Sequence, residues 1–515
     1  MQSTRNIFFI MFIVFLLSAG FALATEDADA LNAKRVEALL STLPGSVHTS
    51  AIEVKGDTLV VRGLTASLRV QEGESTVRTV LSIDEITCTG VNFAAVDTPG
   101  VQRLAASVRI KGYAAKADFI PPAHMTGTHA FSNKTLTRSV SINDLHGDVA
   151  DLNKAVSDTG SLIRLLRPLL SFRVDSMNME EWSAHLEREG IRLRADINAF
   201  STRDFGLLHS GPTKMEGFTL ELDGKKALQI DSAGHESLRF TELVAPFLAL
   251  DVTKPGMEAE ALAILISSLK DLSFSMEGLH ITGVRTLLTE LGDNSLRRMS
   301  GSLTAAFPEV KLDGKVEDLT LSPTLYAAFG PQGKALAEYY GKSVQFSGGV
   351  QAAASNRLDG GSVTLDEFKA VEPNLGTAAL SLKLTYSPSL LALFASPKDL
   401  NVGVQEAELL LDDRGIGDLF FALMLKENNQ EPDEKLLSIV RSEAALGIRK
   451  AAHDKGGKYA EAAEALAQLC AQSGKVTLRL RSDAPIPMDD IINFRPLEEL
   501  EAQYSAPEQR DAETP

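Results

Sequence analysis

Cysteine is almost absent from this sequence, because Cys88 and Cys470 are the only two in 515 residues. Nothing therefore resembles a paired-cysteine redox site. Cys88 alternates with Ile86 along a strand-like run, and Cys470 follows Leu466 on one helical face. This spacing predicts two buried thiols, and the alternative is a disulfide that closes a very long loop.

Tryptophan and positive charge are also scarce. Trp182 is the only tryptophan, so aromatic anchors for carbohydrate or protein partners are few. Lys and Arg number 51 against 68 Asp and Glu, which gives a formal net charge of −17. Phosphate binding needs clustered basic residues, so the composition argues against nucleic acid as a partner. It equally disfavours electrostatic adhesion to anionic lipid head groups.

The signatures of several enzyme classes are missing as well. The sequence contains no G-x-S-x-G nucleophile elbow, no H-E-x-x-H zinc motif, no phosphate-binding loop and no calcium loop. The stretch "GPQGKALAE" has a Gly-Lys pair but lacks the remainder of a phosphate loop, and it predicts a helix break near Gly330-Pro331. We therefore expect a non-catalytic protein without a cofactor.

The remaining clusters of histidines and acids predict no reaction. His124 and His129 in "PAHMTGTH" have no cysteine or carboxylate nearby, so we expect solvated loop histidines rather than a metal site. A general acid/base pair must face one bond across a gap, which adjacent acids rarely achieve. We expect the adjacent acids to cap helices instead. These pairs are Asp412-Asp413 and Asp489-Asp490.

The N-terminus has the three parts of a secretory signal peptide. Arg5 is followed by an apolar run from Ile7 to Leu17, and "SAGFALA" then leads into polar sequence. We expect cleavage after Ala24; the alternative is an uncleaved inner-membrane anchor. The expected location is extracytoplasmic, in the periplasm, with membrane contact only through this segment if it stays attached.

Hydrophobic periodicity then divides the chain into helical and strand-rich segments. Strand-rich blocks predominate, with expected helices at 151–170, 256–270 and 323–341, and three more within 414–472. The expected segments are 1–24 as signal peptide or anchor, 25–45 as an N-terminal helix, 46–150 as β-rich, 151–410 as β-rich with inserted helices, 411–503 as a helical block with a return strand, and 504–515 as a disordered tail.

A glycine pattern recurs in the strand-rich blocks. In "LVVRGLTASL" the apolar residues change from odd to even positions across Gly63, so one strand face cannot stay apolar without an interruption there. Such a glycine is typical of a bulge that bends the strand. The fold class predicted is α+β, with mostly antiparallel, strongly curved sheets, interspersed helices and a helical block near the C-terminus. The candidate bulge glycines are Gly63, Gly90, Gly112, Gly217 and Gly278.

Behind an N-terminal signal or anchor, strands such as "LVVRGLTASL" and "LSFSMEGLHITGV" resemble those of the AsmA-like family of bacterial envelope proteins. The resemblance lies in the general pattern of short strands over residues 30–410. It includes no catalytic motif whose residues could be assigned in this sequence. It implies curved sheets with an apolar inner face, and a role in lipid transport or envelope homeostasis. The helical block at 414–472 departs from the family pattern.

Two functions from different classes follow. The first is a non-catalytic envelope protein that binds lipid or another apolar ligand on a curved sheet. The second is an extracytoplasmic scaffold for another envelope protein, which acidity and few aromatic residues favour. An uncharacterised hydrolase is a distant third.

Overall fold

The computed structural model describes most of the chain between residues 28 and 507. The described residues are 28–41, 45–72, 75–95, 100–120, 131–148, 171–188, 190–206, 208–240, 263, 273–306, 308–357, 360–387, 401–428, 430–453, 457–492 and 499–507. The predicted signal segment, the predicted helix at 151–170, all but residue 263 of the predicted helix at 256–270, and the histidines His124 and His129 lie outside them.

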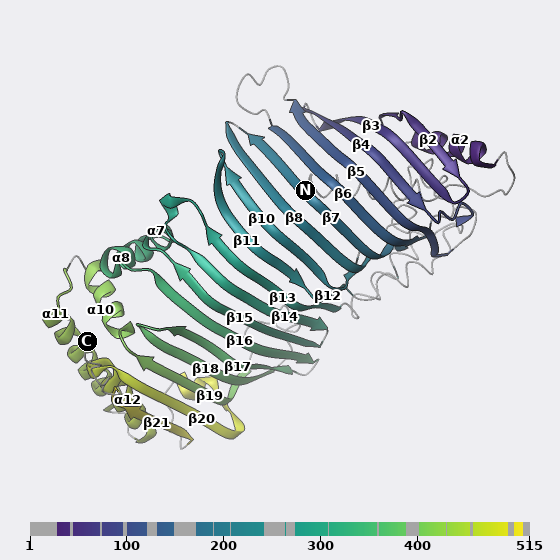
Figure 1. Cartoon of the computed structure of the whole chain (residues 1–515). Coiled ribbons are helices and arrows are strands. Elements are labelled where there is room, and N and C mark those ends of the chain that lie inside the picture. Colours follow the sequence, from purple (N-terminus) through teal and green to yellow (C-terminus); the bar gives the residue numbers. More distant parts are fainter. Residues whose placement is uncertain are drawn as a thin grey trace, which may run out of the picture. The chain divides into compact units, whose positions relative to one another are not determined.

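The protein is mostly β-structure (Figure 1). Its described strands, 21 in number, belong to an antiparallel sheet in which consecutive strands usually pair. The expectation of an antiparallel, β-rich fold with helices near the C-terminus is confirmed. The chain divides into two compact units, Met1–Ile281 and Thr282–Pro515.

The first unit is a meander of long strands. Strands β3 to β8 follow one another in antiparallel pairs, and β10 and β11 continue the series. The short β1 and β2 both pair with β3. The strands are β1 (Ser46–His48), β2 (Ala51–Lys55), β3 (Thr58–Glu72), β4 (Ser75–Thr89), β5 (Gln102–Ile120), β6 (Phe131–Gly147), β7 (Arg173–Arg188), β8 (Ile191–Gly206), β9 (His209–Ser210), β10 (Thr213–Leu222), β11 (Lys225–His235), β12 (Ser237–Phe240) and β13 (Ser273–Thr286).

The second unit repeats the meander and adds helices. Strands β14 to β21 pair consecutively. The strands are β14 (Ser295–Ala306), β15 (Glu309–Leu321), β16 (Val344–Arg357), β17 (Gly360–Glu372), β18 (Gly376–Ser387), β19 (Asn401–Asp413), β20 (Gly474–Pro487) and β21 (Leu500–Ser505). The helices are the 3-10 turn η3 (Thr289–Leu291), α7 (Pro323–Ala327), α8 (Pro331–Tyr340), α10 (Ile416–Glu427), α11 (Glu434–His453), α12 (Gly457–Gln472) and α13 (Met488–Ile492).

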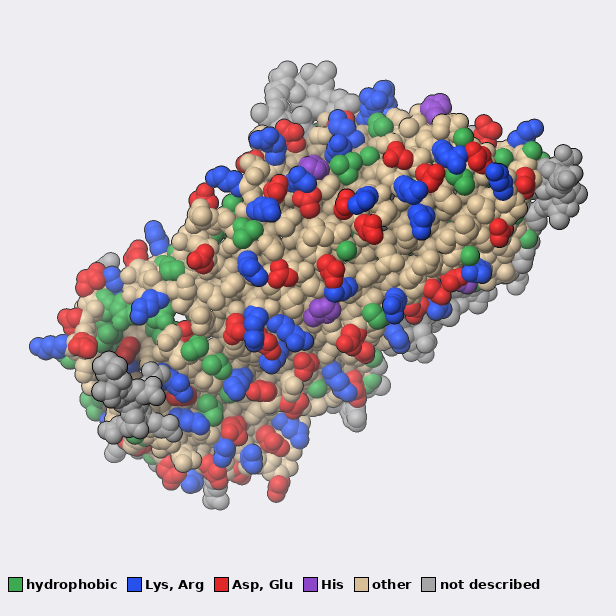
Figure 2. Space-filling model, viewed as in Figure 1, with side chains coloured by type: hydrophobic (Ala, Val, Ile, Leu, Met, Phe, Trp, Pro, Cys, Tyr) green, Lys and Arg blue, Asp and Glu red, His purple; other side chains and the backbone are tan. Residues whose placement is uncertain are grey.

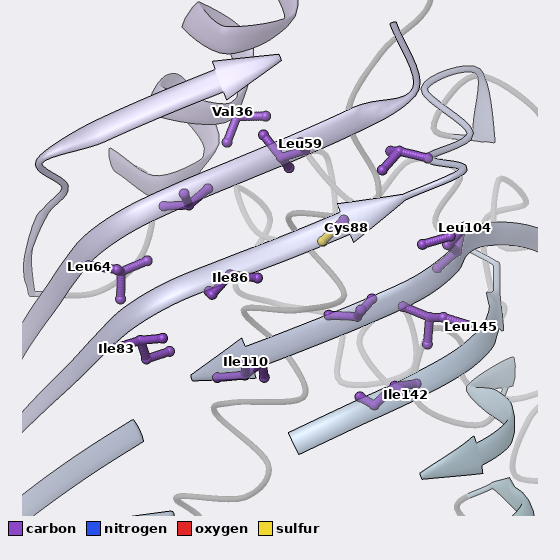
Figure 3. Packing of buried hydrophobic residues seen from close by; sticks show 14 of the residues in the cluster. Val36, Leu59, Leu64, Ile83, Ile86, Cys88, Leu104, Ile110, Ile142 and Leu145 are labelled. Carbon is purple, nitrogen blue, oxygen red and sulfur yellow. The ribbon is translucent and has the colours of Figure 1, made fainter. Parts of the chain in front are cut away.

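The core of the first unit lies between strands β2–β7 and the N-terminal helix α2 (Ala28–Ser41). Val36 on this helix and Leu59 on β3 are both fully buried, and Cys88 on β4 lies in the same cluster (Figure 3). Fully burying a side chain of this kind contributes about 1.5–3 kcal/mol. The predicted helix at the start of the chain is confirmed at this position.

The helices of the second unit are joined by one buried arginine. Arg441 on α11 is 5% exposed and donates to Asp413 at the end of β19 (3.0 Å) and to Asp418 on α10 (2.6 Å). Its guanidinium also donates to the backbone carbonyl of Cys470 on α12 (2.6 Å). Three helices and a strand end are therefore fixed to one guanidinium, whose five donors suit several acceptors at once.

Most local expectations in the second unit are confirmed. Three helices occupy the predicted block, and α7 and α8 are separated at the predicted break, where Pro331 begins α8. The predicted disordered tail is wrong at its first two residues, because Tyr504 and Ser505 belong to β21. Tyr504 pairs with Val476 and donates its hydroxyl to the Ser473 carbonyl at 2.8 Å.

The two thiols are found without a disulfide, and one of the two predicted helix caps is found as well. Cys88 is a buried thiol and Cys470 a half-buried one, with no disulfide between them. Asp413 Oδ1 accepts from the backbone N–H groups of Gly415 and Gly417, both at 3.0 Å, and so caps the start of α10. Asp489 and Asp490 lie in the first turn of α13. Among the helices described, none is long and apolar enough to cross a membrane.

Candidate apolar binding surface

The glycines singled out by the sequence share an unusual backbone conformation. All five have φ between +57° and +66°, in the left-handed region. L-residues other than glycine, asparagine and aspartate rarely adopt it. Four of them lie within strands, and Gly90 directly follows β4. The glycines are Gly63, Gly90, Gly112, Gly217 and Gly278.

At Gly63 the apolar positions change parity without any shift of register. Arg62 pairs with Glu85 before the glycine, and Leu64 pairs with Ile83 after it. Val61 and Leu64 are both fully buried although three positions separate them. The partner strand β4 changes parity at the same place. Its apolar residues therefore stay on the face that β3 buries, and the apolar face remains continuous.

The glycines leave space for polar side chains on the adjacent strand. A Cβ atom at Gly112 would overlap the Asp84 carboxylate, and one at Gly217 would overlap the Asn198 amide. The pairing of the neighbouring residues places these positions in one line across the first unit. In strand order the line is Gly63, Asp84, Gly112, Arg138, Glu181, Asn198 and Gly217.

Four acidic residues inside strands adopt the same left-handed conformation, with φ between +47° and +51°. Each forms an ion pair with an arginine on the preceding strand. The sequence did not predict these four residues, because the only local signal is that apolar residues change between odd and even positions without a glycine between them. The pairs are Arg103–Asp144, Arg138–Glu181, Arg173–Asp204 and Arg297–Asp318.

In the second unit a left-handed residue keeps the apolar side chains on one wide face of the sheet. On β15, Val316 and Leu319 lie on either side of left-handed Asp318 and pair with apolar or small residues of β14. Directly paired residues share one face of a sheet. From β14 to β20 nearly every pair on this face is apolar or glycine. Examples are Leu296 with Leu319, Leu303 with Leu312, Leu312 with Ala352, Val350 with Phe368, Leu365 with Leu382, Leu380 with Leu409 and Leu409 with Leu478.

Helices of the same unit cover this face at its C-terminal strands. Leu469 on α12 packs with Val476 of β20 and Leu411 of β19. Tyr459 of α12 and Met488 of α13 contact the cluster that includes β18. The face of β18–β21 is therefore buried in the manner of an ordinary sheet-and-helix core.

The same face is much less covered over β14–β17. Phe368 is 44% exposed, Val310 43% and Leu312 41%. Among the described residues of β14–β18, Tyr386, at 8% exposure, is the only large apolar side chain that is buried. We call the half-exposed face of β14–β17 the apolar surface. Contiguous exposed apolar area of this kind marks interaction or ligand sites.

The described residues bear directly on the metal and acid–base sites considered from the sequence. They contain no group of three or more His, Cys, Asp or Glu side chains that could hold a metal ion. Asp412 pairs with Arg414 at 2.9 Å, and Asp413 is held by Arg441, so neither acid faces an open gap. The chain matches no protein-family model and no curated protein.

Proposed function

We propose that this is a non-catalytic protein of the bacterial envelope that binds an apolar ligand, such as a lipid acyl chain, on the apolar surface of β14–β17. The observation that supports the proposal is the partial exposure of Val310, Leu312 and Phe368 within a face that helices bury elsewhere. Covering each such side chain completely is worth roughly 1–2 kcal/mol, which an acyl chain can supply without specific hydrogen bonds.

The rows of left-handed residues support the curvature that such a role needs. A left-handed residue changes the direction of an extended strand, and aligning such residues on neighbouring strands lets the whole sheet bend there. We propose that the line from Gly63 to Gly217, and the Arg297–Asp318 pair in the second unit, bend the sheet in this way. The resemblance to AsmA-like proteins and the N-terminal signal pattern agree with an extracytoplasmic lipid-binding role.

The ligand proposal is tested by titrating a fluorescent fatty-acid analogue into the folded protein. Phe368→Glu places a charge on the apolar surface, and Thr364→Glu places the same charge on the opposite face of the same strand. Phe368 pairs with Leu380, whereas Thr364 pairs with Lys383. Saturable binding that Phe368→Glu weakens at least tenfold, and that Thr364→Glu leaves unchanged, supports the proposal. Equal binding by both variants rules it out.

A scaffold function is the second candidate, and a stripe on α10 favours it. Ile416, Phe420 and Met424 are 41%, 57% and 41% exposed, and their spacing of four residues places them on one helix face. The opposite face of α10 packs through Phe421 and Leu425. Hydrophobic side chains gather where α8, α10 and α11 lie (Figure 2). Phe420→Ser changes the exposed stripe of α10, whereas Phe421→Ser changes its packed face. Comparing the two variants in a pull-down from envelope extract separates loss of a partner from loss of folding.

A further inference from the structure

A polar cavity in the first unit is lined by residues from five strands, and four of these strands supply a basic side chain. Its volume is about 460 Å³, within the range of small-ligand sites. Ser176 comes from β7, Arg203 from β8, Lys214 from β10, His235 from β11 and His280 from β13. The cavity lies far along the chain from the apolar surface, and it belongs to a different compact unit.

The charges in the cavity are unequal. Arg203 and Lys214 are permanent cations, and Glu236 is the one carboxylate in the lining. Lys214 forms an ion pair with Glu216, whereas Arg203 forms none with any residue that the structure describes. An unpaired guanidinium beside a cavity is suited to bidentate binding of an oxyanion.

The two histidines add ring nitrogens that a phosphate group could contact. His235 Nε2 lies 2.7 Å from the Ser210 hydroxyl, which leaves Nδ1 for a ligand. His280 Nδ1 lies 3.0 Å from the Gly278 carbonyl, which can only accept, so this nitrogen donates and Nε2 of the neutral ring is an acceptor for the P–OH group of a ligand. Burial, and then the nearby His280, lower the pKa of His235, which favours its neutral imidazole.

Hydroxyl groups complete the lining. Thr202 and Thr213 hydrogen-bond to each other through their hydroxyls at 2.8 Å, and Ser176, Ser201 and Asn178 lie around them. Gly234 makes room for the His280 ring, since a Cβ atom there would come within 3.0 Å of Cε1. Cations and hydroxyls around one hollow form the donor set that phosphate groups take in proteins.

The polar cavity of the second unit provides a contrast. It has a similar volume, about 440 Å³, and is lined by Arg297 and Lys315. Both of these cations are neutralised by Glu317, at 3.0 Å and 2.8 Å. Lys369 is the third cation of that lining, so the contrast lies in Arg297 and Lys315, which are paired, whereas Arg203 forms no ion pair with any described residue.

We propose that the cavity around Arg203 and His280 binds a phosphate-type oxyanion, either a free phosphate or the phosphate of a lipid head group. Arg203 donates to the anionic oxygens, His280 Nε2 accepts from a P–OH group of the ligand, and the hydroxyls of Ser176 and Ser201 complete the contact. This site is independent of the apolar surface, so either proposal can fail while the other stands.

The test is calorimetric titration of the full-length protein with two probes, inorganic phosphate and short-chain phosphatidic acid below its micelle concentration. We expect saturable binding of at least one probe, weakened roughly tenfold or more by Arg203→Gln. Arg192→Gln, on the same strand but outside the cavity, is the matched control. Binding of phosphate alone identifies a small-solute site, and binding of phosphatidic acid alone identifies a head-group site.

A second measurement separates binding in the cavity from a general charge effect. The ring resonances of His280, assigned by their loss in His280→Gln, should shift on titration with the probe that binds. Absence of saturable binding by both probes would overturn the proposal. So would equal weakening by Arg203→Gln and Arg192→Gln, or binding that leaves the His280 resonances unmoved.

Discussion

Gly112 lies directly across the β4–β5 pair from Asp84, and its missing side chain leaves the space that the Asp84 carboxylate occupies. Gly112 therefore meets two structural requirements at one position. Gly112 adopts a φ of +62° that lets β5 exchange its faces, and it also accommodates a polar side chain from the adjacent strand. The requirement for glycine there is therefore both conformational and steric.

Gly112→Ala should lower the stability of the first unit by more than about 2 kcal/mol, because left-handed strain and overlap with Asp84 add together. Gly56→Ala is the control: Gly56 has a φ of +58°, but a Cβ atom there meets nothing within 4 Å. It should cost only about 1 kcal/mol. Adding Asp84→Ala to Gly112→Ala should recover part of the loss in chemical denaturation. Equal losses for the two glycine variants would contradict the steric half of the account.

Glu181→Gly tests whether an acidic residue is strained at a position where other strands have glycine. Its φ is +51°, and it forms an ion pair with Arg138 at 2.6 Å. Glu181→Gly removes about 1 kcal/mol of backbone strain and an exposed pair worth about 0.2–1 kcal/mol, so the melting temperature should stay nearly constant. Glu180→Gly, one residue earlier in the strand, should lower stability by about 0.5–1 kcal/mol. The reverse ranking would show that the strain is absent.

Much of this architecture follows from local sequence, and the exceptions have physical causes. The left-handed glycines Gly63 and Gly112 can be predicted from the sequence, because the apolar residues change between odd and even positions across each of them. Asp144 and Asp318 could not be predicted, since their supporting arginines lie on another strand and an aspartate alone does not identify left-handed backbone. The strand at Tyr504 was missed for a similar reason. Its pairing with Val476 is distant in sequence, while its own neighbours are polar.

The sequence also does not predict which part of the apolar face is exposed. The alternation that places Leu312 and Phe368 on one face is the same alternation that places Leu478 there. The positions of α12 and α13 bury the part of the face at the C-terminal strands. Helix packing is a tertiary relationship, and leucine spacing alone does not determine it.

Arg441 should be the most sensitive charged residue of the second unit. Arg441→Met leaves buried Asp413 without its guanidinium, and breaking a buried pair of this kind costs about 3–5 kcal/mol. Arg449, on the same helix, bonds Glu464 at 2.8 Å but is 43% exposed, so Arg449→Met should cost only about 0.2–1 kcal/mol. Denaturation followed by circular dichroism at 222 nm reports the helices directly. Similar losses for both variants would contradict the assigned role of Arg441.

Glu464 should titrate far below an ordinary glutamate. Hydrogen bonds from Arg449 and then Gln468 lower its pKa from 4.5 to about 2. Because the folded-state pKa is depressed, the contribution of this pair is complete above about pH 4.5 and is lost as pH falls towards 2. Carboxyl carbon NMR should show this midpoint, and Arg449→Gln should raise it. A midpoint above pH 4 in the unmodified protein would show that the pair does not persist in solution.

The central claim, that the apolar surface of β14–β17 carries a ligand, is tested most directly by native mass spectrometry. The full-length protein is purified gently from its own envelope fraction, with lipid extraction of a parallel sample and Phe368→Glu as comparison. The account predicts a mass excess matching a lipid in near-stoichiometric amount, released only on denaturation and absent from Phe368→Glu. A bare protein mass, with no lipid in the extract, would contradict it.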